Sequence, residues 1–127
     1  MSKLPTDINQ EQFKEFTENT NQKPFVMLNL LKFKKDGGQE DYFRYLKESS
    51  PFGTKIGASV DYFGIPKEML TGTEDWDLIM LIRYPSRKAF LEMINNPDYL
   101  KAHEWRKKGV ERAVLYATDP TKFLRTI

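Results

Sequence analysis

The fold is decided by the stretch Trp76-Asp-Leu-Ile-Met-Leu-Ile-Arg-Tyr84. Every even-numbered position in it carries an apolar or aromatic side chain, and Ile79 and Leu81 add apolar side chains on the other side of an extended chain. A second run of this kind is Phe25-Val-Met-Leu-Asn-Leu-Leu-Lys-Phe33. Runs that are apolar on both faces are typical of strands buried on both faces. The two stretches therefore predict the central strands of one sheet.

The segments around these strands alternate between helix and strand patterns. After a turn at residues 36–38, helical spacing predicts a helix from Gln39 that is ended or broken at Pro51 and Gly53. Its apolar face carries Tyr42, Tyr45, Leu46 and Ser49. The other predicted elements are a helix at 8–19, a strand at 58–64 with Val60 and Tyr62 on one side, a helix after the N-cap Ser86, a helix at 97–108 after the N-cap Asn96 and a strand at 110–118.

The order of these elements indicates the fold class. From residue 24 it is strand, helix, strand, strand, helix pair, strand, which is the βαββαβ order of a ferredoxin-like α+β sandwich. Its helices cover only one face of the sheet, so the other face, with Ile79 and Leu81 at its centre, needs a partner. A second copy of the sheet is the simplest partner. We expect an accessory helix and connector at 1–23, this domain at 24–120 and a tail at 121–127.

Composition narrows the function classes. The 20 basic and 18 acidic residues are interspersed and leave a net charge of +2, which predicts no binding to nucleic acid or to a membrane surface. The longest apolar run, 25–31, is too short to span a bilayer. The chain has no cysteine, which excludes disulfides, thiolate nucleophiles and cysteine-ligated metals. Residues 1–12 show no apolar signal segment, so we expect a cytoplasmic protein.

Four positions are candidates for chemistry. Asn29 interrupts an apolar strand, where an unsatisfied amide costs about 1–3 kcal/mol, so it either orients a ligand or is satisfied at the dimer seam. Asp77 and Arg83 lie on one strand face about 20 Å apart, so each needs a partner elsewhere, a polar ligand group or solvent at the ends of the strand. His103, the only histidine, is either a general base or metal ligand, or a surface residue.

Several segments resemble a known family. They are the stretch Trp76–Phe90, Asn96-Pro-Asp-Tyr99, Glu111-Arg-Ala-Val-Leu-Tyr116 and the run Phe25–Phe33. They are similar to the family of unknown function numbered thirteen-thirty, within the dimeric α/β barrel superfamily. The resemblance covers roughly residues 24–120 and implies a ferredoxin-like protomer and a homodimer whose sheets form a barrel. It implies no activity, because none is established for that family.

A more distant resemblance connects residues 90–103 to the haem-degrading monooxygenases of the same superfamily, and the chain is similar in fold pattern to antibiotic-biosynthesis monooxygenases. In the haem-degrading proteins a helix histidine ligates the haem iron, and an asparagine on the first strand and a tryptophan complete the site. Asn29 and His103 stand at the matching positions, but Met93 stands where the tryptophan would be. We therefore expect no haem, no other cofactor and no metal.

Two hypotheses remain open. In the first, the protein is a cofactor-independent enzyme, monooxygenase- or isomerase-like, that acts on a small carbonyl or phenolic metabolite. Asn29 would then orient the substrate, Arg83 would stabilise oxyanion charge and His103 would move a proton. In the second, it is a non-catalytic homodimer that binds a small molecule or has a structural role. An enzyme should bring these three residues together in one pocket. Further ligand contacts are expected from Tyr62, Asp77 and Met93.

Overall fold

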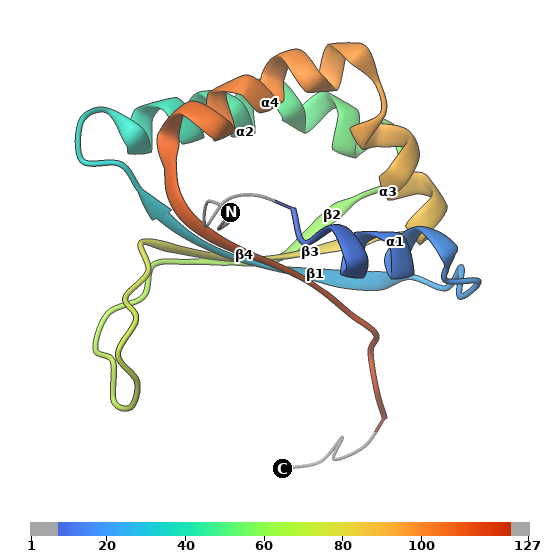
Figure 1. The fold of residues 1–127 in the computed structure, drawn as a ribbon, viewed down its shortest axis with the longest axis horizontal. Coiled ribbons are helices and arrows are strands. Elements are labelled where there is room, and N and C mark those ends of the chain that lie inside the picture. The colour runs from blue at the N-terminus through green and yellow to red at the C-terminus, as the bar shows by residue number, and fades with distance from the viewer. Residues whose placement is uncertain (1–7, 123–127) are drawn as a thin grey trace.

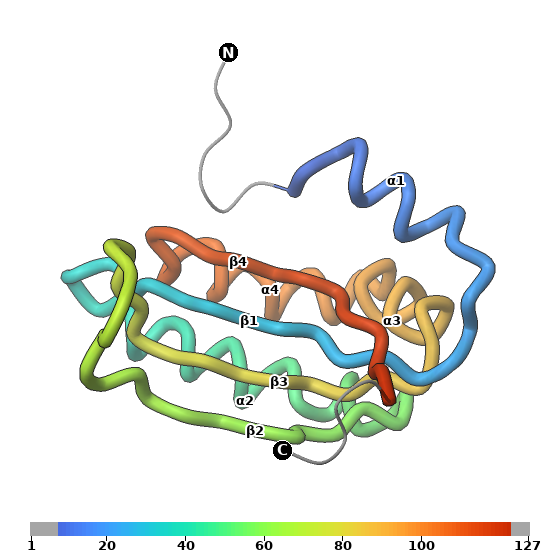
Figure 2. The backbone as a smooth tube through the Cα atoms, turned by 90° about the horizontal axis from the view of Figure 1, so that it is seen from below, coloured from blue at the N-terminus to red at the C-terminus, as the bar shows by residue number. Residues whose placement is uncertain are grey.

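The two apolar stretches form neighbouring central strands of one antiparallel sheet in a computed structural model, which describes residues 8–122 (Figure 1). The strand order is β2-β3-β1-β4; in Figure 2, helices α2, α3 and α4 lie behind the sheet and α1 lies beside its β4 edge. The elements are α1 (Gln10–Glu18), β1 (Phe25–Phe33), α2 (Gly38–Lys55), β2 (Ser59–Gly64), β3 (Leu78–Tyr84), α3 (Arg87–Ile94), α4 (Pro97–Gly109) and β4 (Val110–Thr118). The predicted ferredoxin-like α+β fold is confirmed.

Strand register defines two faces of the sheet. Asn29 of β1 lies opposite Met80 of β3 and Leu115 of β4, and all three point toward the helices; we call this side the inner face. Leu28 and its neighbours point to the other side, which no helix covers; we call this side the open face. Burial along β1 alternates accordingly, with the inner residues buried and the open-face residues half-buried.

Local sequence explains where the helices after β3 begin. Ser86 caps α3 by accepting a hydrogen bond from the Ala89 amide at 3.0 Å. Asn96 caps α4 by accepting one from the Asp98 amide at 2.9 Å, and Pro97 occupies the first turn, where its missing N–H costs nothing. The two caps predicted from the sequence are confirmed.

The predicted end of the second helix is wrong. Helix α2 continues through Pro51 to Lys55. Proline removes one intrahelical hydrogen bond, but Pro51 and Lys47, whose carbonyl it frees, are both exposed. Water can therefore satisfy that carbonyl, and the helix is kept.

The predicted faces of the 58–64 strand are also wrong. A bulge at Asp61 places Val60 opposite Ile82 on the inner face and Tyr62 opposite Leu81 on the open face. The next strand begins at Leu78 and not at Trp76, so Trp76 and Asp77 belong to the preceding loop. The bulge thus moves Tyr62 away from the helices.

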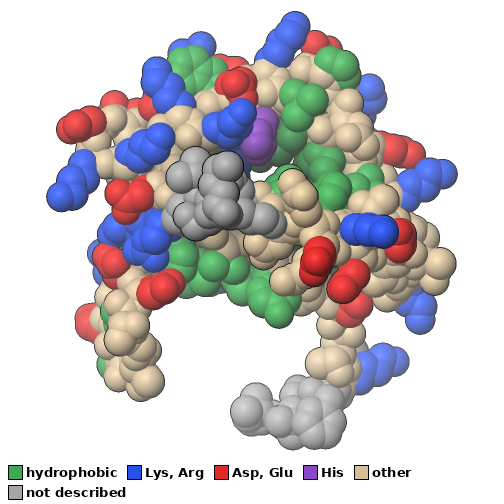
Figure 3. Space-filling model, viewed as in Figure 1, with side chains coloured by type: hydrophobic (Ala, Val, Ile, Leu, Met, Phe, Trp, Pro, Cys, Tyr) green, Lys and Arg blue, Asp and Glu red, His purple; other side chains and the backbone are tan. Residues whose placement is uncertain are grey.

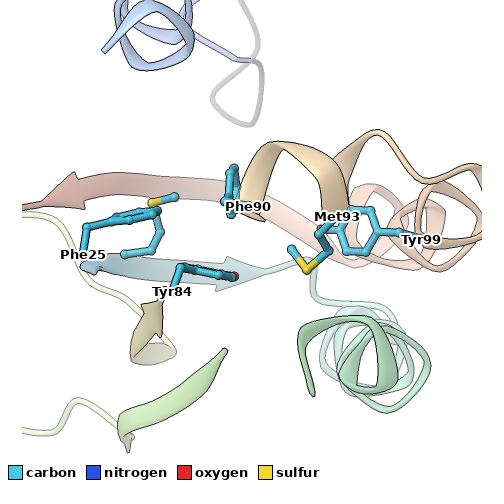
Figure 4. Packing of buried hydrophobic residues seen from close by; sticks show 6 residues of the cluster. Phe25, Tyr84, Phe90, Met93 and Tyr99 are labelled. Carbon is cyan, nitrogen blue, oxygen red and sulfur yellow. The ribbon is translucent and has the colours of Figure 1, made fainter. Parts of the chain in front are cut away.

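The core beneath the helices is divided into two clusters. The first contains Phe25, Met27, Tyr84, Phe90, Met93 and Tyr99, most of which Figure 4 shows between the sheet, α3 and α4. The second contains Leu31, Tyr42, Leu78, Met80 and Val110. On β1, Asn29 lies between Met27 of the first cluster and Leu31 of the second. Tyr45 packs against both clusters. A polar strand residue therefore marks the division of the core.

Candidate functional site

Asn29 carries a buried amide that the protein satisfies only in part. The residue is buried, with 8% of its surface exposed. The amide nitrogen donates to the Met27 carbonyl at 3.3 Å, and no residue within 8–122 donates to Oδ1. Within the same range, the only fully buried side-chain polar atom without a partner is Nε of Arg87. The Asn29 oxygen therefore keeps some contact with the space outside the protein, and it has a lone pair to offer there.

The helices place three further polar side chains above the sheet. The hydroxyl groups of Tyr45 on α2 and Tyr99 on α4 are 2.8 Å apart and share a hydrogen bond. The ring of His103, one turn after Tyr99, lies 6.1 Å from the Tyr45 ring and 5.9 Å from the Tyr99 ring. Tyr45 also packs against both core clusters, between which Asn29 lies on β1. We call Asn29, Tyr45, Tyr99 and His103 the inner cluster.

Burial favours the uncharged forms of His103 and Tyr99. The pKa of His103 is lowered to about 4, mainly by burial and also by the nearby charges of Arg106 and Lys107, while Glu104 acts in the opposite direction. Burial likewise raises the pKa of Tyr99 far above its ordinary value. The ring nitrogens of His103 hydrogen-bond to no residue in the described part of the chain. A neutral imidazole with an unpaired nitrogen can accept a proton.

The shifted pKa of His103 predicts how stability depends on pH. Between about pH 6.5 and 4 the unfolded chain binds a proton at His103 and the folded chain does not, so stability falls as the pH falls through this window and the loss is complete below it. The full shift corresponds to about 3 kcal/mol, and because water reaches part of the ring we expect about 1–2 kcal/mol. Urea unfolding at pH 7 and pH 4 should show a smaller pH effect for His103→Gln than for the natural protein. Equal pH effects would contradict the assignment.

The inner cluster reaches solvent along the β4 edge of the sheet. Leu115, opposite Asn29 on the inner face, is 50% exposed, and the small residues Ala113 and Ala117 flank it on that face. Figure 3 looks at this edge and shows the histidine at the surface, with hydrophobic side chains and a hollow beside it. This opening lies between β4 and α4.

Two predicted site residues form ion pairs away from the inner cluster. Arg83 lies on the open face and donates to Asp61 of β2 at 2.7 Å from Nη2 and 3.1 Å from Nε. Asp77 accepts a hydrogen bond from the Phe33 amide at 2.9 Å and pairs with Lys32 at 3.4 Å, which ties the loop before β3 to β1. The predicted convergence of Arg83 with Asn29 and His103 does not occur, because the sheet separates them.

The other two predicted ligand contacts differ in position. Tyr62 is exposed on the open face, where the bulge in β2 directs it. Met93 is buried in the first core cluster beside Phe90 and Tyr99. Of the six residues named from the sequence, the structure therefore places only Asn29, His103 and Met93 between helices and sheet.

Sequence reasoning missed the roles of Tyr45 and Tyr99. Helical spacing puts Tyr45 on the apolar face of its helix, and the signal that could have found the pair is chemical. A tyrosine on a buried helix face carries a hydroxyl group that needs a partner, and two such helices packed together can satisfy each other. Tyr99 lies in the first turn of α4, which packs along α2.

Two surface hollows lie elsewhere in the molecule. One, of about 520 Å³, lies between α1 and α3 and is lined by Thr17, Gln22, Lys88, Leu91, Glu92 and Asn95. The other, of about 570 Å³, lies where β1 leads into α2 and includes Lys32, Lys34, Phe43, Phe63 and Ile65. Neither is lined by Asn29 or His103. Within residues 8–122 no three acidic or histidine side chains are grouped so as to hold a metal ion.

Comparison with known proteins assigns the family. Residues 30–119 match the model of a domain of unknown function, DUF1330. The chain is a DUF1330 protein. Its structure is similar to that of the RPA0582 protein of unknown function from Rhodopseudomonas palustris, with 32% identity and a TM-score of 0.87 over 94% of this chain and 99% of that one. No curated protein matches the DUF1330 chain.

More distant structures share the fold alone. A dimeric protein of unknown function with a ferredoxin-like fold from Bacteroides fragilis is 11% identical, with a TM-score of 0.55 over 76% of this chain and 96% of that one. SnoaB, a cofactor-independent oxygenase from Streptomyces nogalater, is 10% identical, with a TM-score of 0.59 over 82% of this chain and 99% of that one. None of the helices described in the DUF1330 chain is both long and apolar enough to span a membrane.

Proposed function

We propose that the protein is a homodimer in which each protomer binds a small carbonyl or phenolic molecule at the inner cluster and acts on it without a cofactor. The observation that carries this proposal is the Oδ1 atom of Asn29, which belongs to a residue only 8% exposed and has no donor from the described chain. A native core rarely keeps such a group unless a ligand or water satisfies it. The group also lies where the two core clusters are separated.

The chemistry of the inner cluster suits proton transfer. Asn29 offers an oxygen and its second N–H to a hydroxyl or carbonyl group of the ligand. Neutral His103 can accept a proton from an acidic C–H or O–H bond, which leaves an enolate or phenolate, and the linked hydroxyls of Tyr45 and Tyr99 offer a donor to the oxygen that gains the charge. SnoaB, described as a cofactor-independent oxygenase, has the same fold, which supports the proposal by analogy.

The open face supports the homodimer. Val26, Leu28, Leu30, Ile79, Leu81 and Val114 are all half-buried in the isolated protomer and form a continuous apolar surface. The charges at its ends are paired within the protomer, Arg83 with Asp61 and Lys32 with Asp75. An interface with two-fold symmetry brings each patch against its own copy. Because the charges at the ends of the patch are paired, this contact creates no like-charge repulsion. The Bacteroides fragilis neighbour is described as dimeric.

A non-catalytic binding protein is the alternative. It is favoured by the position of Arg83, which is on the open face and paired with Asp61, so the cation expected to stabilise an oxyanion is not near His103. The two functions differ in what His103 does. In an enzyme, His103→Gln should keep ligand binding and lose turnover, whereas a binding protein shows no turnover to lose.

Replacing Asn29 by leucine tests the site itself. Because leucine removes a half-satisfied amide, we expect the melting temperature to stay the same or rise while small-molecule binding is lost. Binding is measured by heteronuclear NMR with phenol and acetylacetone as probes. Asn95→Leu makes the same change at an exposed position and should bind both probes normally. If Asn29→Leu strongly destabilises the protein or breaks the dimer, the amide has a structural role and the ligand site is not at Asn29.

A further inference from the structure

The loop between β2 and β3, residues 65–77, extends away from the helices on the open side of the sheet, and we call it the arm (Figure 1). Its outermost apolar side chains are solvent-exposed to an unusual degree: Leu70 is 93% exposed and Met69 49% exposed. Ile65 at its start is also exposed. Adjacent apolar side chains at the end of a projecting loop are costly in water and typical of a contact surface.

The base of the arm is fixed to the sheet by charges. Lys32 of β1 binds the Asp75 carboxylate at 2.6 Å. Arg112, which lies opposite Lys32 on β4, donates to the Asp75 carbonyl at 2.9 Å and to its carboxylate at 3.3 Å. The Arg112 guanidinium also stacks 4.6 Å from the centre of the Trp76 ring. These contacts determine the direction in which the arm leaves the sheet.

We infer that the arm is a clasp for the second copy of the chain, in which Met69 and Leu70 of each protomer pack against the other protomer. This inference rests on the homodimer proposed above. The arm and the apolar open face lie on the same side of the sheet, so a partner that covers the face must come within reach of the arm. Two-fold symmetry then places both arms across the interface.

The ion pairs at the base of the arm also favour a second copy of the chain as its partner. The acidic residues at the base of the arm, Glu74, Asp75 and Asp77, are each paired with Lys32 or Arg112 within the protomer. The arm therefore presents its apolar end without an unpaired charge at its base that would repel an identical partner. The alternative explanation for an exposed Met-Leu pair is contact with a lipid surface. The experiment below distinguishes contact with lipid from contact with a second copy of the chain.

A single cysteine reports whether the arm is covered. The natural chain has no cysteine, so Leu70→Cys carries one thiol. In the dimer we expect a maleimide dye to label this thiol at least about tenfold more slowly than in the Leu28→Asp background, where the dimer is broken. Lys47→Cys, on the exposed side of α2, should be labelled at the same rate in both backgrounds.

The outcomes are distinguishable. If the natural protein is a dimer and the thiol of Leu70→Cys is labelled as fast as in the Leu28→Asp background, the clasp is overturned and the homodimer stands. If the natural protein is a monomer, the clasp and the homodimer are both wrong. Leu70→Asp provides a second measurement and should raise the dimer Kd about ten- to a hundredfold, because a buried leucine is lost from each arm. Binding of the natural dimer to phosphatidylcholine vesicles that is lost in Leu70→Asp would assign the arm to lipid and overturn the clasp.

Discussion

Leu28→Asp is expected to convert the proposed dimer into monomers. Leu28 lies at the centre of the open face, opposite Leu81 on β3 and Tyr116 on β4. A two-fold interface would bury the new carboxylate and bring its copy from the other protomer close to it, so the change adds both desolvation and like-charge repulsion. These costs should raise the dimer Kd about a thousandfold or more. Light scattering after gel filtration should show the mass fall from twice 15.0 kDa to 15.0 kDa.

The protomer itself should tolerate this change. Leu28 is only half-buried in the isolated protomer, and its new carboxylate would face water once the partner has left. Circular dichroism should therefore show the same secondary structure in both proteins. Lys47→Asp changes the charge by two units on the exposed side of α2, against one unit for Leu28→Asp, and should leave the mass unchanged. A natural protein that is already monomeric, or a Leu28→Asp variant that stays dimeric, would refute the open-face interface.

Much of the fold was predictable because it depends on local patterns. The central strands are apolar on both faces, and Ser86 and Asn96 are N-caps whose preference arises within one helical turn. The bulge at Asp61 was not predictable, because it is set by pairing with β3 and not by the sequence of β2. The same bulge puts Tyr62 on the open face, so one non-local feature explains why Tyr62 was wrongly predicted to share a strand face with Val60.

The candidate site was predictable only where one residue stood out from its surroundings. Asn29 interrupts an apolar run and His103 is the only histidine, and both lie between the helices and the sheet. The contact between Tyr45 and Tyr99 depends on how two helices distant in sequence pack together. Likewise, the partner of Arg83 could not be read from spacing along one strand, because it comes from the neighbouring strand.

The close approach of α2 and α4 determines where the inner cluster lies, and it depends on two glycines. A Cβ atom on Gly109 would lie 2.5 Å from the Gly38 carbonyl oxygen, and one on Gly38 would lie 2.6 Å from the Gly109 carbonyl oxygen. The Gly109 oxygen is also held by the Lys34 amide at 2.9 Å, so the backbone there has little room to move. Added side-chain atoms would force the start of α2 away from the end of α4.

Gly109→Ala should therefore destabilise the protein by about 2–3 kcal/mol, the cost of forcing a methyl group into a filled site. Because Tyr45 and Tyr99 hydrogen-bond across the same two helices, the change should also weaken probe binding at the inner cluster. Gly53→Ala is the matched control, because its Cβ would lie 3.7 Å from the Ala58 Cβ, which is an ordinary contact. Alanine is a better helix former than glycine, so this change within α2 should raise the free energy of unfolding by about 0.5–1 kcal/mol. Urea unfolding at pH 7 compares the three proteins. If Gly109→Ala proves as stable as the natural protein, the two backbones can separate freely, and the helix contact does not fix the geometry between Tyr99, His103 and the sheet.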